Sequence, residues 1–393
     1  MKIMHLLSRL KAEGKYKLET TRLRQHQRKK KTVEVVPEHR CSGCGGCKNI
    51  CPVDAVTLQE NEFGYLLPKV EKEKCVNCGL CLKHCPGVEK TVTDSETIPK
   101  AYAVWAKDEV RKASSSGGMF TLLAQWVLQQ KGMVYGAAFT EQWDVAHIGI
   151  EKEEELSKLR GAKYVQSDTG FVYRNVKEAL NAGRSVLFSG CPCQVSALKS
   201  YLGKEYPHLL TADLVCHGVP SRMVYRKDLE EVYGKDNIEN FSFRTKEKGY
   251  SCTVLEVKLK DGRTLYPSLK EKDPYEKAFH GSYALRKSCI NCKFAEFPRQ
   301  GDFTIGDYWG VSLYDEKLND EKGTSVVLVN SKKAEQVLEE IRSQAKLVQE
   351  TPLEAAKRKN RFGAYVSVPK MRDDFLEETA KNGFSEAVKK YLK

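Results

Sequence analysis

One short segment, residues 41–86, constrains the fold of this chain more than any other. The pattern C-x2-C-x2-C-x3-C-P occurs in it twice. The cysteines of the two runs are Cys41, Cys44, Cys47 and Cys51, then Cys75, Cys78, Cys81 and Cys85. Gly43, Gly45 and Gly46 lie inside the first run and let the backbone pass close to whatever the thiols hold. A segment so short and so rich in thiols is organised by the group that those thiols bind.

This spacing is the ligand pattern of bacterial ferredoxins with two 4Fe–4S clusters, in which the fourth Cys of each run binds the other cluster. It predicts one cluster on Cys41, Cys44, Cys47 and Cys85, and a second on Cys75, Cys78, Cys81 and Cys51. Two zinc knuckles are the alternative. Zinc sites pair two C-x2-C units across a longer loop, so a third Cys at the same spacing argues against zinc. We therefore expect this segment to carry single electrons.

Length and composition bound the rest of the chain. The 393 residues suggest two or three domains, and a hydrophobic content of 41% suffices for packed cores. We expect no membrane span, because no stretch approaches roughly 18 uninterrupted apolar residues. The segment 1–10 is too short and too polar for a signal peptide, so we expect none there. Of the 14 Cys, eight have cluster spacing, which favours a reducing, cytoplasmic location.

Positive charge is concentrated at the N-terminus. Residues 1–40 contain 12 Lys and Arg and 4 acidic residues, so they carry +8 of the total charge of +13. Such a segment can contact nucleic acid, anionic lipid or an acidic protein. We expect a solvated, poorly ordered basic tail over 1–36. Nucleic acid is not an expected partner, because only Tyr16 is interleaved with the basic residues.

Strand and helix patterns alternate after the cysteine runs. Strands are expected at 101–106, 133–139, 185–188, 209–215 and 324–330, and helices at 119–129, 194–201 and from the N-cap Ser331 to 341. The pair Asp261-Gly262 predicts a hairpin within 241–269. The fold class is therefore α/β (α+β overall): a two-cluster ferredoxin module, then a mixed α/β domain with a β-hairpin insertion.

The expected boundaries follow from these patterns. They are the basic tail at 1–36, the ferredoxin-type domain at 37–88, a polar linker at 89–99, the two parts of the α/β domain at 100–180 and 181–345, and a helical C-terminal extension at 346–393.

Six cysteines lie outside the two runs: Cys191, Cys193, Cys216, Cys252, Cys289 and Cys292. Cys193 and Cys216 follow the ends of expected strands, which in an α/β sheet meet at one crevice. Cys289 and Cys292 form a C-x2-C pair. Four of these thiols could hold a third cluster. Alternatively, they are buried cysteines that pack as small apolar residues.

Several motifs in order carry a resemblance to a known family. They are GYLLP (64–68), SSGG (115–118), LRGAKYVQS (159–167), GCPCQ (190–194), CHGVPS (216–221), FRTKEKG (243–249) and GDFTIGDYWG (301–310). The chain resembles the family of coenzyme F420 hydrogenase/dehydrogenase beta subunits, including members with a fused two-cluster ferredoxin, from about residue 37 to about residue 345.

The resemblance implies FAD held by the α/β domain and a 4Fe–4S cluster beside it, with Cys193, Cys216, Cys289 and Cys292 as ligands. Cys191 stands where relatives more often have Thr or another residue without a thiol, so Cys191 could compete with Cys193. Cys252 has no counterpart and is expected to be structural.

The candidate FAD residues form two groups. The loop of small residues comes just before a helix, whose free N–H groups suit a phosphate. The second group offers an ammonium, an amide and a hydroxyl to the pyrophosphate or ring edge. The residues are Ser115, Ser116, Gly117 and Gly118, with Lys163, Gln166 and Ser167. Asp307 and Trp309 could line the same pocket, or could be a turn and a core anchor. The sequence predicts no catalytic residue.

The function that follows is a flavin- and iron–sulfur-dependent oxidoreductase. It would pass electrons between a ferredoxin-type or other redox protein and an organic hydride donor or acceptor, for which the resemblance suggests coenzyme F420. Four basic residues could bind the acidic tail of that coenzyme: Arg244, Lys246, Lys248 and Arg299. The alternative is an electron-transfer adapter within a larger redox complex, without a small-molecule substrate of its own.

Overall fold

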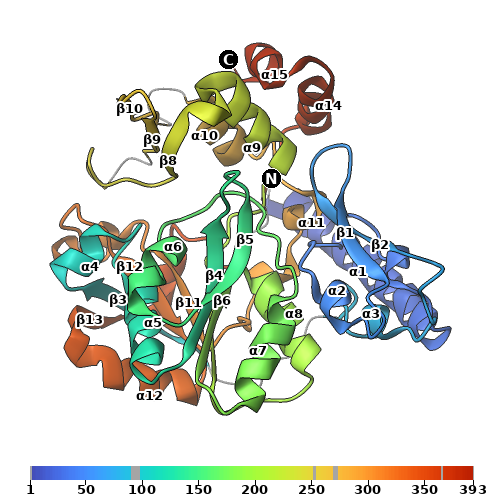
Figure 1. The fold of residues 1–393 in the computed structure, drawn as a ribbon, viewed down its shortest axis with the longest axis horizontal. Helices are drawn as coiled ribbons and strands as arrows, with labels where there is room; N and C mark the ends of the chain where they lie inside the picture. Colours follow the sequence, from blue (N-terminus) through green and yellow to red (C-terminus); the bar gives the residue numbers. More distant parts are fainter. Residues whose placement is uncertain (1, 90–97, 251–253, 269–272, 364–365, 393) are drawn as a thin grey trace.

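The computed structural model describes residues 2–89, 98–250, 254–268, 273–363 and 366–392. Most of the expected linker, 90–97, and Cys252 lie outside these ranges. The described chain forms three regions: an N-terminal module, a central sheet with flanking helices, and a cap above the sheet (Figure 1).

The N-terminal module is built around its cysteines. Its elements are α1 (Lys2–Arg28), the 3-10 turn Val33–Val35, α2 (Gly46–Ile50), β1 (Val56–Glu60), β2 (Leu66–Val70) and α3 (Leu80–Lys83). Strands β1 and β2 pair antiparallel. Cys47, Cys51 and Cys81 are buried among apolar side chains such as Val56 and Leu82. Thiols are therefore part of the apolar core of this module.

Helix α1 lies within residues 1–36, where the charge pattern predicted a basic tail. Leu23 is 4% exposed and belongs to the apolar core of the module. The Gln27 amide donates to the Leu82 carbonyl at 3.2 Å, and the buried Arg40 guanidinium donates to Thr20 Oγ1 at 3.2 Å. A few anchors on one face thus hold a helix whose overall charge suggested a solvated arm.

The central sheet has eight strands in the order β13-β3-β12-β11-β7-β6-β4-β5. Pairs β4–β6, β6–β7 and β7–β11 are parallel, and the remaining neighbours are antiparallel. The strands are β3 (Lys100–Ala106), β4 (Met133–Phe139), β5 (Val145–Ile150), β6 (Val186–Gly190), β7 (Leu209–Leu214), β11 (Phe303–Asp307), β12 (Ser325–Val329) and β13 (Ala345–Thr351).

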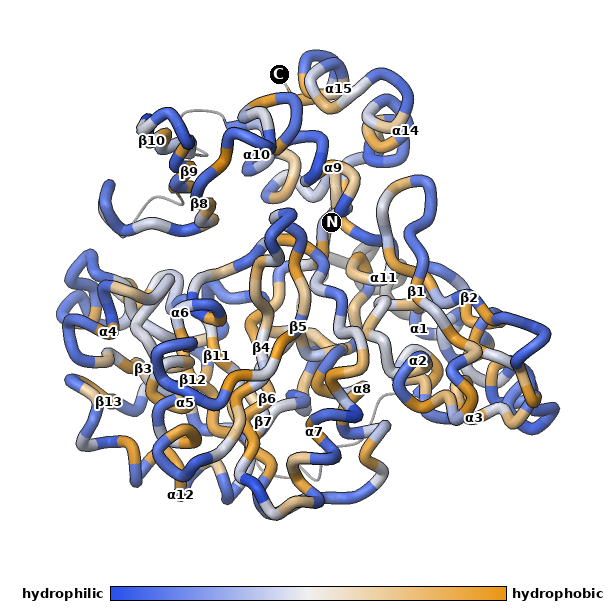
Figure 2. Tube along the Cα trace, viewed as in Figure 1, coloured by the Kyte–Doolittle hydropathy of each residue, from blue (hydrophilic) through white to orange (hydrophobic). Residues whose placement is uncertain are grey.

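Helices cover both faces of the sheet, because alternate residues of its strands point to opposite sides. On one face, α5 (Met119–Gln129) and α12 (Lys332–Ile341) pack on residues such as Leu187 and Leu210. On the other, α7 (Val172–Asn181) and α8 (Pro192–Leu202) pack on Val186 and Phe188. Hydrophobic residues follow the central strands in Figure 2. The fold class expected from the sequence, a mixed α/β domain after a ferredoxin module, is confirmed.

The cap has an aromatic core of its own that includes Tyr225, Phe243 and Tyr275. The expected hairpin is part of a three-stranded antiparallel sheet in the order β10-β9-β8. The elements are α9 (Arg222–Asp228), the π-turn Leu229–Tyr233, the 3-10 turn Lys235–Asn237, β8 (Ile238–Ser242), β9 (Glu256–Leu259), β10 (Thr264–Leu265), α10 (Pro274–His280), α14 (Arg372–Asn382) and α15 (Phe384–Tyr391).

Short elements connect these regions. They are α4 (Asp108–Lys112), α6 (Leu156–Leu159), α11 (Lys287–Ile290) and α13 (Leu353–Lys357), with 3-10 turns at Glu153–Glu155, Lys293–Ala295, Val311–Leu313, Glu316–Leu318 and Arg342–Gln344.

The expected helical extension from 346 differs from the structure at its start. Residues up to Thr351 form the edge strand β13, paired with β3. Helices α14 and α15 then bury Phe375 and Phe384 in the cap. The C-terminal segment is therefore integrated into two regions, which its Lys-rich composition did not reveal.

Candidate functional site

The two cysteine runs fold as the crossed pattern requires. One-turn helices α2 and α3 each carry the chain from a third cysteine to a fourth. The thiols that raise the pKa of Cys47 are, in order of effect, Cys44, Cys41, Cys85 and Cys81, and those that raise the pKa of Cys81 are Cys78 and Cys51. Most of them belong to the sets that the spacing predicted, and the assignment of ligands stays a prediction.

Burial determines the chemistry of these thiols. It raises the pKa of Cys47 well above its ordinary value, and the adjacent thiols raise it further. Burial likewise raises the pKa of Cys85. A metal group supplies the positive charge that ionises such thiols, so the donor set fits iron–sulfur clusters. Within the described ranges, no three His, Cys, Asp or Glu side chains meet as closely as the ligands of a single metal ion.

A further set of thiols encloses a small cavity of about 50 Å³. Its lining includes the four cysteines that the resemblance implied as ligands: Cys193, Cys216, Cys289 and Cys292. Tyr16 of α1 and Arg40 close the same cavity. Among charged groups, Cys44 of the ferredoxin module acts most strongly on the pKa of Cys193 and raises it. This set therefore lies next to the first thiol set of the module.

Cys191 takes a different position from Cys193. Cys191 does not line the small cavity but lines a larger one, whereas Cys193 and Cys216 line both. The Sγ atoms of Cys191 and Cys216 lie 3.9 Å apart. That contact raises the pKa of Cys191 and lowers the pKa of Cys216 to about 7, so Cys216 ionises first. The choice of Cys193 over Cys191 as the ligand stays a prediction.

The large cavity has a volume of about 570 Å³. It lies at the carboxyl ends of β6, β7 and β11, where ligands of α/β sheets bind. Its wall includes the N-terminus of α5 and the ferredoxin loop residues Ser42 and Gly43. It also includes His147, His217, His280 and Arg361, none of which the sequence singled out. Asp307 and Trp309 line it as well.

Most of the expected FAD residues face this cavity: Ser115, Ser116, Gly118, Lys163, Gln166 and Ser167. Gly117 does not line it. A Cβ on Gly117 would lie 2.1 Å from the Val104 carbonyl oxygen and 2.4 Å from the Ser325 nitrogen. Gly117 therefore permits the loop to pass close against the paired strands β3 and β12, and its part in FAD binding stays a prediction.

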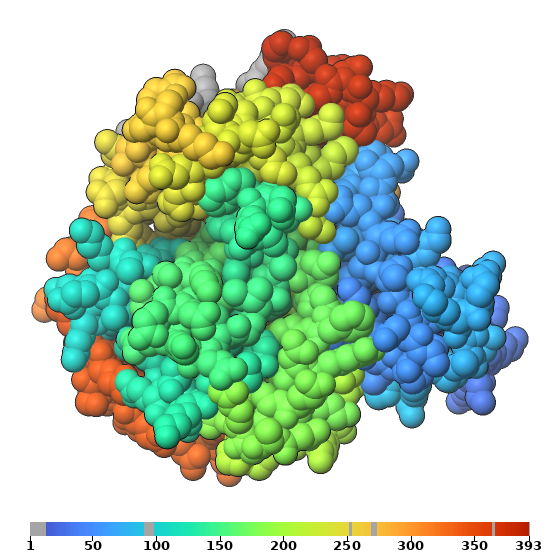
Figure 3. All heavy atoms as spheres, in the orientation of Figure 1, coloured from blue at the N-terminus to red at the C-terminus, as the bar shows by residue number. Residues whose placement is uncertain are grey.

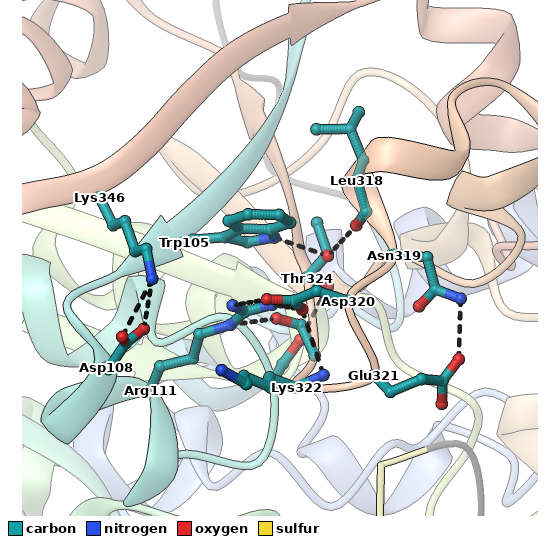
Figure 4. Close-up of polar contacts among 12 residues, drawn as sticks. Trp105, Asp108, Arg111, Leu318, Asn319, Asp320, Glu321, Lys322, Thr324 and Lys346 are labelled. Carbon is teal, nitrogen blue, oxygen red and sulfur yellow. Dashed lines mark hydrogen bonds and ion pairs between the residues drawn. The ribbon is translucent and has the colours of Figure 1, made fainter.

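A polar network beside this loop joins β3 and α4 to residues 318–324 (Figure 4). Arg111 is 1% exposed; its Nε donates to the Gly323 carbonyl and its Nη1 to Asp320, both at 2.7 Å. The Trp105 indole donates to Thr324 Oγ1 at 2.7 Å, and Ser116 Oγ donates to the Thr324 carbonyl at 2.9 Å. The loop is therefore fixed from behind, with its other side on the cavity.

The second group of expected FAD residues braces the cavity. The Lys163 ammonium donates to the carbonyls of residues 159, 160 and 161, and burial lowers the pKa of Lys163 to about 7. The Gln166 side chain accepts from Leu66 N at 3.3 Å and so joins the α/β domain to the ferredoxin module. Ser167 Oγ lies 2.7 Å from Nδ1 of His147, and burial lowers the pKa of His147 to about 4.

The basic residues expected to bind an acidic substrate do not all lie together. Arg244 Nη1 pairs with Asp307 at 2.9 Å, and Lys246 donates to the Ser116 carbonyl at 2.7 Å. Both line a groove of about 1,060 Å³, which shares Ser115 and Lys163 with the large cavity and opens as a hollow in Figure 3.

Arg299 is elsewhere, so its expected place among the substrate-binding residues is wrong. It is 2% exposed, pairs with Asp213 at 3.0 Å and lines the small thiol cavity. Lys248 lies over the ring of Tyr266 at 4.7 Å.

Comparison with known proteins identifies the family. Residues 40–87 match the 4Fe-4S dicluster domain. Residues 101–172 match the N-terminal part, and residues 183–355 the C-terminal part, of the beta subunit of coenzyme F420 hydrogenase/dehydrogenase. The chain belongs to the family of coenzyme F420 hydrogenase/dehydrogenase beta subunits. Members of this family are components of oxidoreductases, and this one carries a 4Fe–4S domain for electron transfer.

Two relatives illustrate the match. The F subunit of F(420)H(2) dehydrogenase from Methanosarcina mazei is 25% identical over 179 residues, which are 43% of this chain and 50% of that protein. The chain thus matches half the length of this curated relative. A structure titled "Xenon derivatization of the F420-reducing [NiFe] hydrogenase complex from Methanosarcina barkeri" aligns over 76% of this chain and 94% of its own, with 18% identity and a TM-score of 0.46.

Across the described ranges, none of the helices combines the length and the apolar character that crossing a bilayer requires.

Proposed function

We propose that this protein is an FAD- and iron–sulfur-dependent oxidoreductase that passes electrons between a ferredoxin-type protein and an organic hydride donor or acceptor. Coenzyme F420 is the first candidate for the organic partner. The observation that carries the proposal is that Cys193 and Cys216 line both the small thiol cavity and the wall of the large one. A cluster held there would lie beside any ligand of the large cavity.

The residues of the large cavity fit FAD. Its volume of about 570 Å³ falls within the roughly 300–1,000 Å³ of cofactor sites. The backbone at the start of α5 offers N–H groups to a pyrophosphate, and Lys163 offers a cation if it is protonated near neutral pH. When bound, a flavin takes up two electrons with a hydride and releases them singly.

The chain's own side chains would position the organic partner and hold its proton. His280 lines the cavity, and its Nε2 contacts the fully buried carboxylate of Glu276 at 2.9 Å. That pair can hold a proton at the cavity wall. The groove beside Arg244 and Lys246 leads to the same wall and suits an acidic substrate.

The proposed ligands of the third cluster are Cys193, Cys216, Cys289 and Cys292. Arg299 donates to the carbonyls of Leu214, Phe294 and Ala295, which keeps the segments that carry these thiols together. Its guanidinium also offsets the negative charge that thiolates bring into a buried site.

Purification without oxygen, with iron, sulfide and flavin measured together, tests the proposal. We expect about twelve iron atoms from three clusters of four, and one FAD per chain. The protein should then reduce a redox dye with reduced coenzyme F420. A full complement of iron without flavin would instead favour the electron-transfer adapter, and about eight iron atoms would remove the third cluster.

A further inference from the structure

Four consecutive basic residues, the last residue of α1 and the three that follow it, lie beside the outermost thiol of the ferredoxin module. Arg28, Lys29, Lys30 and Lys31 are all exposed. The backbone of Lys30 contacts the loop that follows Cys78, since a Cβ on Gly79 would lie 3.0 Å from the Cα of Lys30. One turn earlier, Gln27 is bonded to the carbonyl of Leu82. The basic run is therefore fixed against the second cysteine run rather than projecting away from it.

The adjacent loop is the most open part of the thiol sets. Cys78 is the one exposed cysteine among the 13 that the structure describes. Val76 beside it is 61% exposed, and Asn77 is exposed with a left-handed φ of 51°. A cluster on the second run would thus reach the surface here, at the end of the module away from the large cavity.

Ordinary helix capping does not account for this composition. Cations in a last turn stabilise the helix dipole, and one or two suffice. Lys30, however, has a φ of 52° at the position after the helix, where Gly or Asn is the usual residue because a side chain is strained there. Lys83 of α3 adds a fifth exposed cation. Within the described ranges, none of these five has an acidic partner.

We propose that Arg28, Lys29, Lys30, Lys31 and Lys83, here called the helix-end basic patch, dock a small acidic protein that carries one electron. The inference rests on the proposed function and specifies the place and charge of its protein partner. In each encounter the reduced partner would lose one electron to a cluster held beside Cys78. Two encounters would supply the electron pair of one hydride, and solvent would supply the proton.

The position of the patch favours a protein over other anions. Nucleic acid or an anionic membrane would gain nothing from binding near Cys78 in particular. Proteins that bind single-stranded nucleic acid also stack its bases on aromatic side chains, and the helix-end basic patch contains none. An acidic redox protein gains both attraction and a short path for its electron. Complementary charge mainly accelerates the encounter, by about 10- to 1,000-fold at low salt.

The test uses the full chain with its clusters and a reduced acidic bacterial ferredoxin as the probe. Stopped-flow absorbance follows cluster reduction in the parent and in the triple variant Lys29→Gln, Lys30→Gln, Lys31→Gln. The matched control removes three exposed charges upstream on the same helix: Lys15→Gln, Lys17→Gln, Arg22→Gln. We expect the second-order rate constant to fall at least about tenfold, with a weaker salt dependence, in the patch variant alone.

Reduction by methyl viologen radical should be unchanged in both variants, which shows that the clusters are intact. Lys30→Gly relieves the left-handed strain, so it should melt no lower than the parent and yet react more slowly with ferredoxin. Equal ferredoxin rates in parent and patch variant would overturn the docking surface, as would an equal loss in the control. Binding to phosphatidylserine vesicles or DNA that the patch variant loses, with an unchanged ferredoxin rate, would also overturn it. Failure of the proposed function would be seen in different measurements: the purified protein would lack FAD, or it would not oxidise reduced coenzyme F420.

Discussion

Replacing Asp213 by Asn should destabilise the protein and release the proposed third cluster. Asp213 lies in β7 and is fully buried. One carboxylate oxygen accepts from Arg299 Nη2 at 3.0 Å, and the other accepts from the N–H groups of Gln300 and Gly301 at 2.8 and 2.9 Å. An amide cannot satisfy both sides, because its NH2 group must face either the guanidinium or the two backbone donors.

The burial of the pair sets the size of the effect. The side chains of Arg299 and Asp213 are 1% and 0% exposed. Removing one charge leaves the other buried without compensation, which costs about 3–5 kcal/mol. The exposed pair of Lys100 and Glu335, 2.8 Å apart, provides the control. Glu335→Gln should leave the free energy of unfolding unchanged, because water screens both charges.

Urea unfolding of the anaerobic protein, followed by tryptophan fluorescence, measures the change in stability. Iron per chain after gel filtration measures the cluster. We expect Asp213→Asn to lower the free energy of unfolding by about 3–5 kcal/mol and to lose about four iron atoms, because Arg299 also lines the small cavity. A variant within about 1 kcal/mol of the parent, with all of its iron, would refute the reasoning.

Three further predictions follow from the site. Cys193→Ser should lose the electron paramagnetic resonance signal of the third cluster and Cys191→Ser should keep it; the opposite result would make Cys191 the ligand. Gly117→Ala should lower the free energy of unfolding by about 3 kcal/mol or more, as overpacking does, and lose flavin. Gly161 has a left-handed φ of 84° and no neighbour within reach of a Cβ, so Gly161→Ala should lower the free energy of unfolding by only about 1–2 kcal/mol. Equal losses of stability in the two variants would contradict the packing role of Gly117. His147 has a folded pKa of about 4 against 6.5, so stability should be full above pH 6.5 and fall by about 3 kcal/mol toward pH 4. His147→Asn should flatten that part of the pH profile in urea unfolding, and an unchanged profile would count against the assignment.

Patterns carried by neighbouring residues were visible in the sequence. The x2 and x3 spacings indicate which thiols belong together, and short continuous apolar runs placed buried strands such as Val186–Gly190. The loop before Met119 could be proposed as a phosphate site because it precedes a helix with free N–H groups. These features need no knowledge of distant contacts.

Features set by distant contacts were not visible. Helix α1 is held by Arg40 and by the second cysteine run, and nothing in its composition indicates those anchors. Strand β13 reads as polar, because it forms an edge of the sheet where only one neighbour, β3, pairs with it. Arg299 looked like a surface cation until its partner Asp213, 86 residues away in the chain, was placed beside it.

The contacts between the ferredoxin module and the α/β domain also bear on how electrons would travel. Arg286, 1% exposed, donates to the Leu66 carbonyl at 2.7 Å, and Arg174 donates to the carbonyls of Asn49 and Cys51 at 2.9 Å. A module attached by a linker alone would need no such bonds. They fix the separation between Cys44 and the small cavity, and electron transfer between clusters depends steeply on separation. The proposed path is therefore rigid at its centre, and only its outer end near Cys78 is left open to a partner.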